Sequence, residues 1–480
     1  MTALLTLLPC GVVVVAILIF RLSGLVAAGL SLACALALWA SGVFADAEIL
    51  HLRHALLDAL VLELLVGVVV FLGSLFVVVS GRGGGLNALG AVVAALGLSI
   101  PRTVILIALG IGVAVESLTG YGVSMLVTVP LLLWVVDRTR TIRLALIGMS
   151  LMSWGALSVA TLLGAEIAGL ATPVLAAAIL KTSGPVAAVL PFVCLIGMTE
   201  VRRSDISHAF VAAGTLVAGI AVTSYWIGVE VAGVGGGLAV ILSAIATSGS
   251  GRDVTRIVFS KAMLPYGLLI AGVVLQKAVI PFCQVIGFNP EIATPRVAFR
   301  IVESPGVALL VVSVISILIV DRSGGGAMVR QTIGRSWRPL AGILLFLLTA
   351  RILVEIGGIA SLAETLSHLG AYFGSVVVTL MAGVGAFATG SGVTSNALFM
   401  SSAVTIGENL DAPVLFAALQ HSGSAHMAMA SLPVIAILVA AMPESQPGDE
   451  STAMRQALGL AGIWLTIVVA SGWVQLALRG

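Results

Sequence analysis

The sequence predicts an all-α integral membrane protein that crosses the bilayer many times. Of its 480 residues, 60% are apolar and only 9% are charged, whereas soluble domains carry roughly a quarter charged residues. The apolar residues gather in runs close to the roughly 20 residues that a membrane-spanning helix requires. The net charge of +2 gives no reason to expect a nucleic-acid partner. The lipid bilayer is therefore the expected surrounding.

The first half of the chain contains apolar runs separated by short polar stretches. These runs lie at 3–20, 22–44, 55–80, 86–100, 103–118, 123–136, 144–164, 166–180 and 184–199. The polar stretch 46–54 is expected at the membrane surface. The loop 137–143 carries Arg138, Arg140 and Arg143, and cytoplasmic loops are enriched in Lys and Arg. We therefore place this loop in the cytoplasm.

The second half repeats this pattern from about residue 207. Its runs lie at 207–226, 229–247, 262–280, 305–320 and 340–357, in a span ending near 388, and at 393–406, 413–432, 433–442 and 456–477. Residues 289–304 are expected to form an amphipathic helix, and the basic loop 322–338 is placed in the cytoplasm. By the length of a membrane span, the chain has about 12 to 14 membrane segments. We divide them into two repeats, 1–206 and 207–480, which could be inverted or parallel.

Two short motifs interrupt the apolar pattern in corresponding places. Residues 119–124 and 389–394 share the pattern T-G-x-G-V-[ST], with an offset of 270 residues. Irregular backbone at membrane depth is tolerated only where it is buried in protein or lines a wet cavity. Paired Gly-interrupted segments in two halves of a chain indicate the binding site of a secondary transporter. The sequence therefore predicts one site between two broken helices.

The chemistry of these motifs suits a small anion. A helix begins with free N–H groups and partial positive charge, which favours a carboxylate. The predicted substrate-binding residues are the small and polar residues of both motifs together with a histidine segment that follows the second. They are Thr119, Gly120, Tyr121, Gly122, Ser124, Thr389, Gly390, Ser391, Thr394, Ser395, Asn396, Gln420, His421 and His426. The alternative is that the small residues only allow close helix packing.

Three ionisable residues are candidates for proton coupling. Glu116 lies 14 residues beyond Arg102, about 21 Å along a helix, and a carboxyl group at that depth is costly to bury. It is expected to accept a proton or to pair with a helix end; the alternative is a neutral structural acid. His421 and His426 titrate in a useful range and can relay protons, or they are hydrogen-bonded packing residues.

Arg351 and Glu355 form a candidate charge pair. They are four residues apart, so they share one face of a helix. Arg351 would either balance a substrate carboxylate or pair permanently with Glu355. The sequence contains no nucleophile–base constellation, zinc-ligand spacing or dinucleotide-binding pattern. We therefore expect no enzymatic activity, no cofactor and no metal.

At these residues the chain resembles the L-lactate permease family. Residues 116–122 are similar to that family's E-G-x-x-G-F-G stretch, and residues 387–399 to its F-L-T-G-S-D-T-S-S-N-A-L-F stretch. The resemblance implies proton-coupled uptake of small 2-hydroxymonocarboxylates, such as lactate or glycolate, across a bacterial plasma membrane. It also implies an elevator-type transporter with paired hairpins, commonly a homodimer, in which Glu116 is the coupling carboxylate.

The chain also departs from that family at several positions. Gly392 stands where the family has an acidic residue, and His426 aligns with a family lysine. Ser117 and Ser124 replace a glycine and a proline. The loss of an acid and a base together indicates a changed polar network and leaves open which anion is carried.

The function predicted from the sequence is proton-coupled symport of a small organic anion. Sodium coupling is an alternative, because unwound carbonyls beside hydroxyls also coordinate Na⁺. An anion channel is an alternative from another class, although a channel places its polar rings along one pore. A membrane enzyme has the least support.

Overall fold

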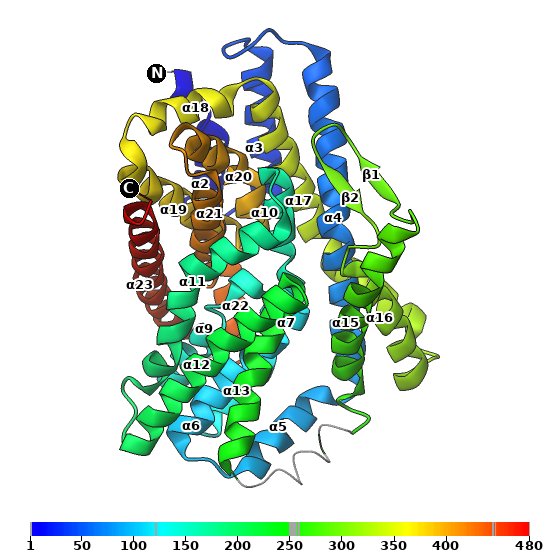
Figure 1. Cartoon of the computed structure of the whole chain (residues 1–480), viewed down its shortest axis with the longest axis vertical. Helices are drawn as coiled ribbons and strands as arrows, with labels where there is room; N and C mark the ends of the chain where they lie inside the picture. The colour runs from blue at the N-terminus through cyan, green and yellow to red at the C-terminus, as the bar shows by residue number, and fades with distance from the viewer. Residues whose placement is uncertain are drawn as a thin grey trace.

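The computed structural model describes residues 2–120, 122–248, 257, 260–443, 446 and 448–479. The protein is 80% helical with almost no strands, so the predicted all-α membrane fold is confirmed (Figure 1). Ten of the described helices are long and apolar enough to cross a membrane. Five shorter apolar helices of 10–17 residues accompany them.

The first part of the chain forms helices of very different lengths, several of which are interrupted. The helices are α1 (Thr2–Leu5), α2 (Leu8–Leu18), α3 (Gly24–Ala40), α4 (Ile49–Arg82), α5 (Gly85–Leu96), α6 (Ile100–Ile105), α7 (Val113–Thr119), α8 (Val123–Leu133), α9 (Arg138–Gly148), α10 (Val159–Ala168), α11 (Thr172–Leu195), α12 (Arg203–Trp226) and α13 (Ala232–Ser248). A π-helical stretch, Leu106–Gly112, joins α6 to α7. Short 3₁₀ turns lie at Met152–Trp154, Ala156–Ser158 and Val229–Val231.

The second part of the chain contains one small hairpin and otherwise only helices. Its elements are α15 (Leu264–Val285), β1 (Glu291–Ala293), β2 (Ala298–Arg300), α16 (Gly306–Val320), α17 (Gly325–Glu355), α18 (Gly358–Ser367), α19 (Gly370–Thr389), α20 (Gly392–Asn409), α21 (Pro413–Ala428), α22 (Leu432–Ala440) and α23 (Asp449–Ala477). The predicted boundary at 206–207 falls inside α12, and the division into two repeats stays a prediction.

Local sequence accounts for many helix ends. The Ser23 hydroxyl accepts a hydrogen bond from the Val26 N–H at the start of α3, and Asp137 does the same for Arg140 in α9. Such caps satisfy N–H groups that have no partner within the helix. Proline occupies the first turn of α11, α15, α21 and α22, where its missing N–H costs nothing.

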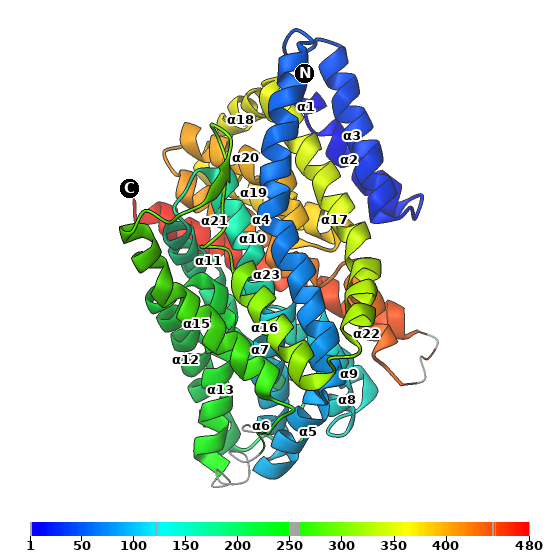
Figure 2. The ribbon, with the colours of Figure 1, turned by 90° about the vertical axis from the view of Figure 1, so that its right-hand side faces the viewer.

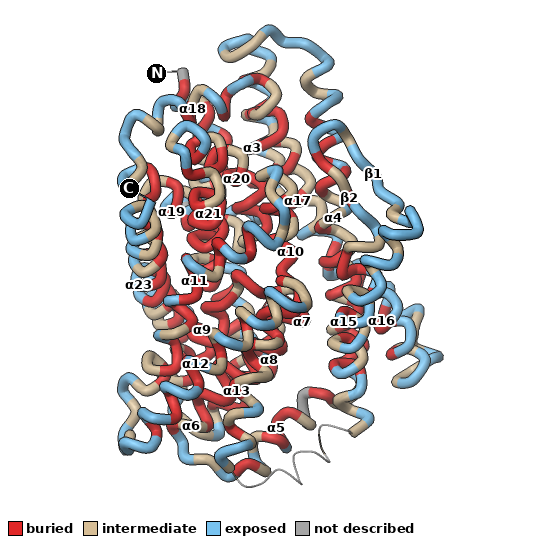
Figure 3. Tube along the Cα trace, in the orientation of Figure 1, coloured by how far each residue is buried: buried red, intermediate tan, exposed pale blue. Residues whose placement is uncertain are grey.

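The helices pack in two groups that lie side by side. In one group α4 packs against α16 and α17, and α17 packs against α3; Figure 2 shows these helices together with the N-terminal ones. In the other group α20 and α21 pack against α10, α11, α19 and α23. Figure 3 shows continuous burial along α20 and α21 and exposed outer faces on α15, α16 and α23. Fully buried polar residues occur in both groups, for example Ser313, Ser316 and Thr332 in the first and Asn396, His421 and His426 in the second.

The prediction of an amphipathic helix at 289–304 is wrong. This segment contains the antiparallel hairpin β1–β2, in which Glu291 pairs with Arg300. Two prolines, at 290 and 295, disfavour a helix here. Val297 and Phe299 are buried while Ala298 and Arg300 are less buried, which is the two-residue alternation of a strand.

Candidate functional site

The first helix break lies where the sequence predicted it. Helix α7 ends at Thr119 and α8 begins at Val123. Gly120 has φ +69° and ψ −173°, a conformation that essentially only glycine adopts. Gly122 is left-handed, with φ +76°. Tyr121, also predicted to bind substrate, lies outside the described residues.

The Glu116 side chain caps the N-terminus of α8, the helix that follows this break. Its carboxylate accepts hydrogen bonds from the Gly122 N–H at 3.1 Å, from the Ser124 N–H at 3.4 Å and from the Ser124 hydroxyl at 2.7 Å. The side chain is buried. The N-terminus of α8 is thus satisfied by an acidic side chain of the protein itself, in line with the preference of helix N-termini for negative charge.

The second break interrupts the chain at the corresponding residue, but its backbone form differs, since Gly390 has ψ 15° where Gly120 has ψ −173°. Helix α19 ends at Thr389, Gly390 is left-handed with φ +76°, and α20 begins at Gly392. The Ser391 hydroxyl accepts a hydrogen bond from the Thr394 N–H at 3.3 Å. The Thr389 hydroxyl donates to the Gly385 carbonyl at 2.7 Å. Residues 389–392 are half-buried, whereas Thr119, Gly120 and Gly122 are buried.

The start of α20 has no acidic cap. Within the described part of the chain, the N–H groups of Gly392 and Val393 have no hydrogen-bond acceptor. The 270-residue offset that relates the two motifs relates Glu116 to Ala386. Ala386 has no carboxylate to offer. Two N–H groups at a helix start are therefore available to an anion at the second break.

The two breaks contact the same short helix. A Cβ atom placed on Gly390 would lie 2.9 Å from Pro433 Cγ, and one placed on Gly122 would lie 3.3 Å from Ile437 Cδ1. Pro433 and Ile437 are four residues apart in α22, which is about 6 Å along a helix. The fold therefore brings the two predicted motifs to neighbouring turns of α22.

Ser431 is a candidate site residue that the sequence analysis missed. It is fully buried and immediately precedes α22, and a Cβ on Gly390 would lie 3.3 Å from its hydroxyl oxygen. That hydroxyl has no hydrogen-bond partner among the residues described. The pattern Ser431-Leu432-Pro433 is a helix-start signal and marks this position in the sequence. A buried polar atom without a partner is costly, so a ligand contact would stabilise it.

Behind the second break, Asn396 and His421 form a fully buried hydrogen-bonded pair. Asn396 Nδ2 lies 3.0 Å from His421 Nδ1 and donates to the Ala160 carbonyl at 2.9 Å. His421 Nε2 lies 3.2 Å from the Ser153 carbonyl oxygen. The Ser424 hydroxyl donates to Asn396 Oδ1 at 3.4 Å. This pair joins α20 and α21 to the segment before α10.

His426 faces a second set of partners one turn further along α21. Its Nδ1 lies 2.7 Å from the Ser150 carbonyl oxygen, and its Nε2 lies 3.0 Å from the Ser183 hydroxyl. The Ser183 hydroxyl donates a hydrogen bond to the Ser422 hydroxyl at 2.9 Å, and the Ser422 and Thr182 hydroxyls are hydrogen-bonded to each other at 2.7 Å. The chain of hydroxyls therefore runs from His426 between α11 and α21.

The other predicted polar residues have structural partners. Ser395 donates to the Ala382 carbonyl at 2.8 Å, and Gln420 Nε2 donates to the Ser395 carbonyl at 3.3 Å. The Thr119 hydroxyl donates to the Val115 carbonyl at 2.6 Å. Thr394 is buried in the first turn of α20. These contacts hold the two breaks in place, and Gly390, Ser391 and Gly392 remain the more accessible residues.

The expected pairing of Arg351 with Glu355 is not formed. Arg351 Nη2 lies 2.5 Å from Asp58 Oδ2, which joins α17 to α4. Glu355 contacts Arg296, between the strands of the hairpin, and His54 at 3.5 Å. Spacing along one helix does not decide the pairing, because each side chain meets an oppositely charged partner from another element.

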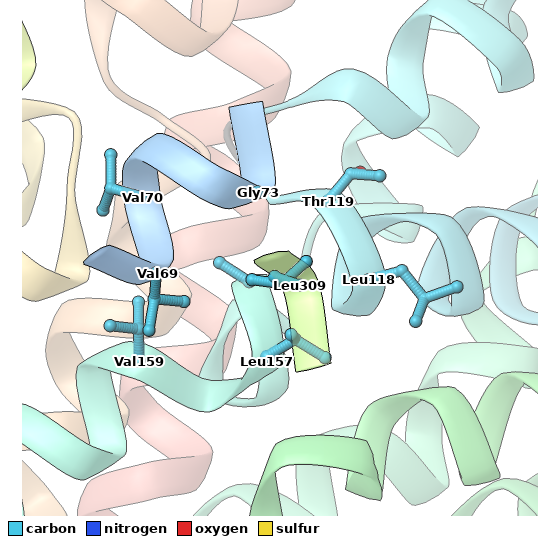
Figure 4. Close-up of a pocket in the computed structure, with 9 residues that line it drawn as sticks. Val69, Val70, Gly73, Leu118, Thr119, Leu157, Val159 and Leu309 are labelled. Atoms are coloured by element: carbon cyan, nitrogen blue, oxygen red, sulfur yellow. The ribbon is translucent and has the colours of Figure 1, made fainter. Parts of the chain in front are cut away.

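A small crevice beside the first break is apolar and does not suit an anion. Val69, Val70 and Gly73 of α4, Leu118 and Thr119 of α7, and Leu309 of α16 line it with Ala156, Leu157 and Val159 (Figure 4). Ala156, Leu157 and Ser158 all have φ near +50°, an unusual left-handed turn for residues other than glycine. A Cβ on Gly120 would lie 2.5 Å from Ala156 Cβ, so this turn packs directly against the break.

The described helices define a polytopic membrane protein in which two related motifs interrupt the helices. A sequence model of the L-lactate permease family matches residues 2–478, and the chain belongs to that family. Membership supports a lactate transporter and points to a permease rather than an enzyme. No curated protein matches the chain.

Proposed function

We propose that the protein is a proton-coupled symporter of small 2-hydroxymonocarboxylates such as lactate and glycolate. The observation that carries this proposal is the difference between the two breaks. The N-terminus of α8 is occupied by Glu116, while the N-terminus of α20 has two unpaired N–H groups within the described structure. A substrate carboxylate at α20 would occupy the place that Glu116 occupies at α8.

The proposed substrate site consists of the first turn of α20 and its surroundings. The N–H groups of Gly392 and Val393 would bind the carboxylate, because helix N-termini favour negative charge. The unpartnered Ser431 hydroxyl lies beside Gly390 and would bind the substrate hydroxyl or carboxylate. Thr389 and Ser391 line the same break. Asn396 and Gln420 hold α20 and α21 in register from behind.

The proposed coupling residues are the buried ionisable groups near this site. Glu116 in α7 and His421 and His426 in α21 are all buried. An ionisable group at membrane depth is a functional candidate because burial of its charge is costly. Uptake of one proton with each substrate anion would leave the loaded protein without added charge. The proposal includes a homodimer in a bacterial plasma membrane.

The experiment is uptake of labelled L-lactate and glycolate by the protein reconstituted in liposomes. An inward proton gradient is expected to drive accumulation, and a protonophore is expected to abolish it. Replacement of sodium by choline should change nothing. Accumulation that depends on sodium and survives the protonophore would replace proton coupling by sodium coupling. Transport without saturation or counterflow would identify a channel instead.

A further inference from the structure

We propose that His426 is the residue that takes up the transported proton, and that His421 is a positioning residue that stays neutral. This inference rests on the proposed proton-coupled function. It comes from the donors and acceptors around each imidazole ring. A neutral ring has one N–H donor and one acceptor nitrogen, whereas a protonated ring has two donors. The two rings meet very different partners.

His421 is surrounded so that one nitrogen must stay unprotonated. Its Nε2 faces the Ser153 carbonyl oxygen at 3.2 Å and the Thr161 hydroxyl at 3.4 Å. The nearer partner, the carbonyl, only accepts hydrogen bonds, so Nε2 carries the hydrogen. Its Nδ1 faces Asn396 Nδ2, which only donates. The amide orientation is fixed because Nδ2 also donates to the Ala160 carbonyl at 2.9 Å, where the amide oxygen could not bind. A proton on His421 Nδ1 would bring two donors face to face.

The partners of His426 allow the hydrogen bonds of its ring to form in both the neutral and the protonated state. Its Nδ1 faces the Ser150 carbonyl oxygen and must therefore carry a hydrogen in either state. Its Nε2 faces the Ser183 hydroxyl, which can donate or accept. In the neutral state Ser183 donates to Nε2. In the protonated state Nε2 donates to Ser183, and no partner is left without a hydrogen bond.

The neighbouring hydroxyls can reorient so that every hydrogen bond is also formed when His426 is protonated. When Ser183 no longer donates to His426, its hydrogen turns toward Ser422, at 2.9 Å, and the Ser422 hydrogen turns toward Thr182, at 2.7 Å. The Thr182 hydroxyl donates to the Ala178 carbonyl at 3.3 Å in both states. One proton is added at Nε2, and only hydroxyl orientations change.

Charge around His426 does not prevent this step. The groups that contact it or continue its hydrogen-bond chain are Ser150, Ser153, Thr182, Ser183, Ser422 and, beyond Ser150, Trp464. The titratable group that acts on it is His421 on its own helix, which the Asn396 contact keeps neutral. Across the described residues, none of these partners carries a charge. The protonated ring would therefore be stabilised by its hydrogen bonds alone until an anion binds.

The same helix connects His426 to the proposed substrate site. Ser424, two residues earlier, lies 3.6 Å from where a Cβ on Gly392 would be and donates to Asn396. Residues two apart on a helix do not share a face, so the site at α20 and the hydroxyl chain lie on different faces of α21 and are connected through the helix itself. A substrate carboxylate at α20 would attract positive charge, which favours the protonated state of His426.

The test is ¹⁵N NMR of ring-labelled histidines in the purified full-length protein as pH is lowered. His421→Gln and His426→Gln, each lacking one set of signals, assign the two rings. The inference predicts the Nε2–H form for His421 and the Nδ1–H form for His426 at high pH. On acidification His426 gains a second ring proton while His421 does not. Protonation of His421 first, or equal titration of both rings, would overturn the inference.

A milder variant tests the hydroxyl chain without removing either histidine. Ser183→Ala deletes the acceptor for the Nε2–H of the charged ring, and hydrogen bonds to charged groups are about twice as strong as neutral ones. The protonated fraction of His426 at a given pH is expected to fall by about tenfold. The matched control is Ser316→Ala in α16, a buried hydroxyl in the other helix group. Equal behaviour of both variants would contradict the relay.

Transport separates this inference from the proposed function. Suppose that vesicles with the wild-type protein accumulate lactate when a proton gradient is imposed. His426→Gln should then reduce this gradient-driven accumulation about tenfold more than it reduces the exchange of lactate across the membrane without a gradient. His421→Gln should reduce gradient-driven accumulation and exchange equally. The reverse pattern would assign coupling to His421. If the wild type shows no gradient-driven uptake, the proposed function fails, and the NMR titration still decides which ring is able to accept a proton.

Discussion

The two helix breaks have nearly the same sequence pattern, and they differ in what occupies the start of the following helix. At the first break the Glu116 carboxylate accepts three hydrogen bonds from Gly122 and Ser124. At the second break the corresponding position is Ala386, and the Gly392 and Val393 N–H groups have no acceptor in the described structure. One break is closed from inside, and the other is open to a ligand.

This difference suggests how one backbone motif serves two purposes. An acidic side chain of the protein and the carboxylate of a small acid present the same chemistry to a helix N-terminus. The first break is therefore a buried version, formed within the protein, of the complex that we propose at the second. Substitutions can therefore make one break resemble the other or weaken one of the two.

The largest effect is expected when the second break is given its own acid. Ala386→Glu would place a carboxylate where Glu116 stands in the first motif, so that it competes with the substrate for the N-terminus of α20. Lactate uptake should fall at least about a hundredfold, because an attached group competes at a high effective concentration. Ala386→Gln, of the same size without the charge, is the control. Equal loss in both variants would show that volume alone matters.

The converse change removes the acidic cap from the first break. Glu116→Ala leaves the Gly122 and Ser124 N–H groups without an acceptor, while the Ser124 hydroxyl retains Met149 Sδ at 3.2 Å. It should lower the free energy of unfolding by about 2 kcal/mol. Glu116→Gln retains one acceptor oxygen and should cost less. Thermal unfolding in detergent measures both variants. An unchanged melting temperature in Glu116→Ala would mean that Glu116 does not stabilise the start of α8.

The glycines of the two breaks should differ in how badly they tolerate a side chain. Gly120→Ala is expected to cost roughly 2 kcal/mol, because its backbone region is essentially restricted to glycine and Ala156 lies 2.5 Å from the new atom. Gly390→Ala should cost less, roughly 1 to 2 kcal/mol, since a left-handed residue other than glycine is strained by about 1 kcal/mol and the new atom would also lie 2.9 Å from Pro433 Cγ. Unfolding in detergent gives both values. Gly214→Ala in α12, with open space around it, is the control and should not destabilise. The opposite order would contradict the comparison.

The smallest effect concerns the hydroxyl beside the open break. Ser431→Ala removes one potential hydrogen bond to the substrate, and a single such bond contributes about 1 kcal/mol. The KM for lactate should rise about fivefold while the maximal rate changes little. Ser313→Ala, another buried hydroxyl without a described partner, should leave KM unchanged. A KM that does not respond to Ser431→Ala would remove this residue from the proposed site.

The sequence was sufficient to predict the membrane class and both breaks. Runs of apolar residues identify spanning helices because the bilayer sets their length, and glycine at Gly120, Gly122 and Gly390 marks backbone that other residues avoid. The positions of α7–α8 and α19–α20 follow from these local rules. Sequence spacing also suggested that Glu116 pairs with a helix end, and its contacts have that form.

Long-range partners could not be predicted in the same way. Arg351 pairs with Asp58, 293 positions away, so spacing along one helix gave the wrong partner. The charged residues of segment 289–304 predict an amphipathic helix, whereas Pro290 and Pro295 and the cross-strand pairing produce a hairpin. Ser431 became visible as a site residue only when folding brought it beside Gly390. The different surroundings of His421 and His426 likewise depend on residues from α10 and α11 and the segment before them.

The most direct test of the central claim is a cryo-EM structure of the protein with bound L-lactate. We expect density for the lactate carboxylate within hydrogen-bond distance of the Gly392 and Val393 N–H groups and beside the Ser431 hydroxyl. Glu116 should still be hydrogen-bonded to Gly122 and Ser124. Lactate bound at the first break in place of Glu116, or bound away from both breaks, would contradict it.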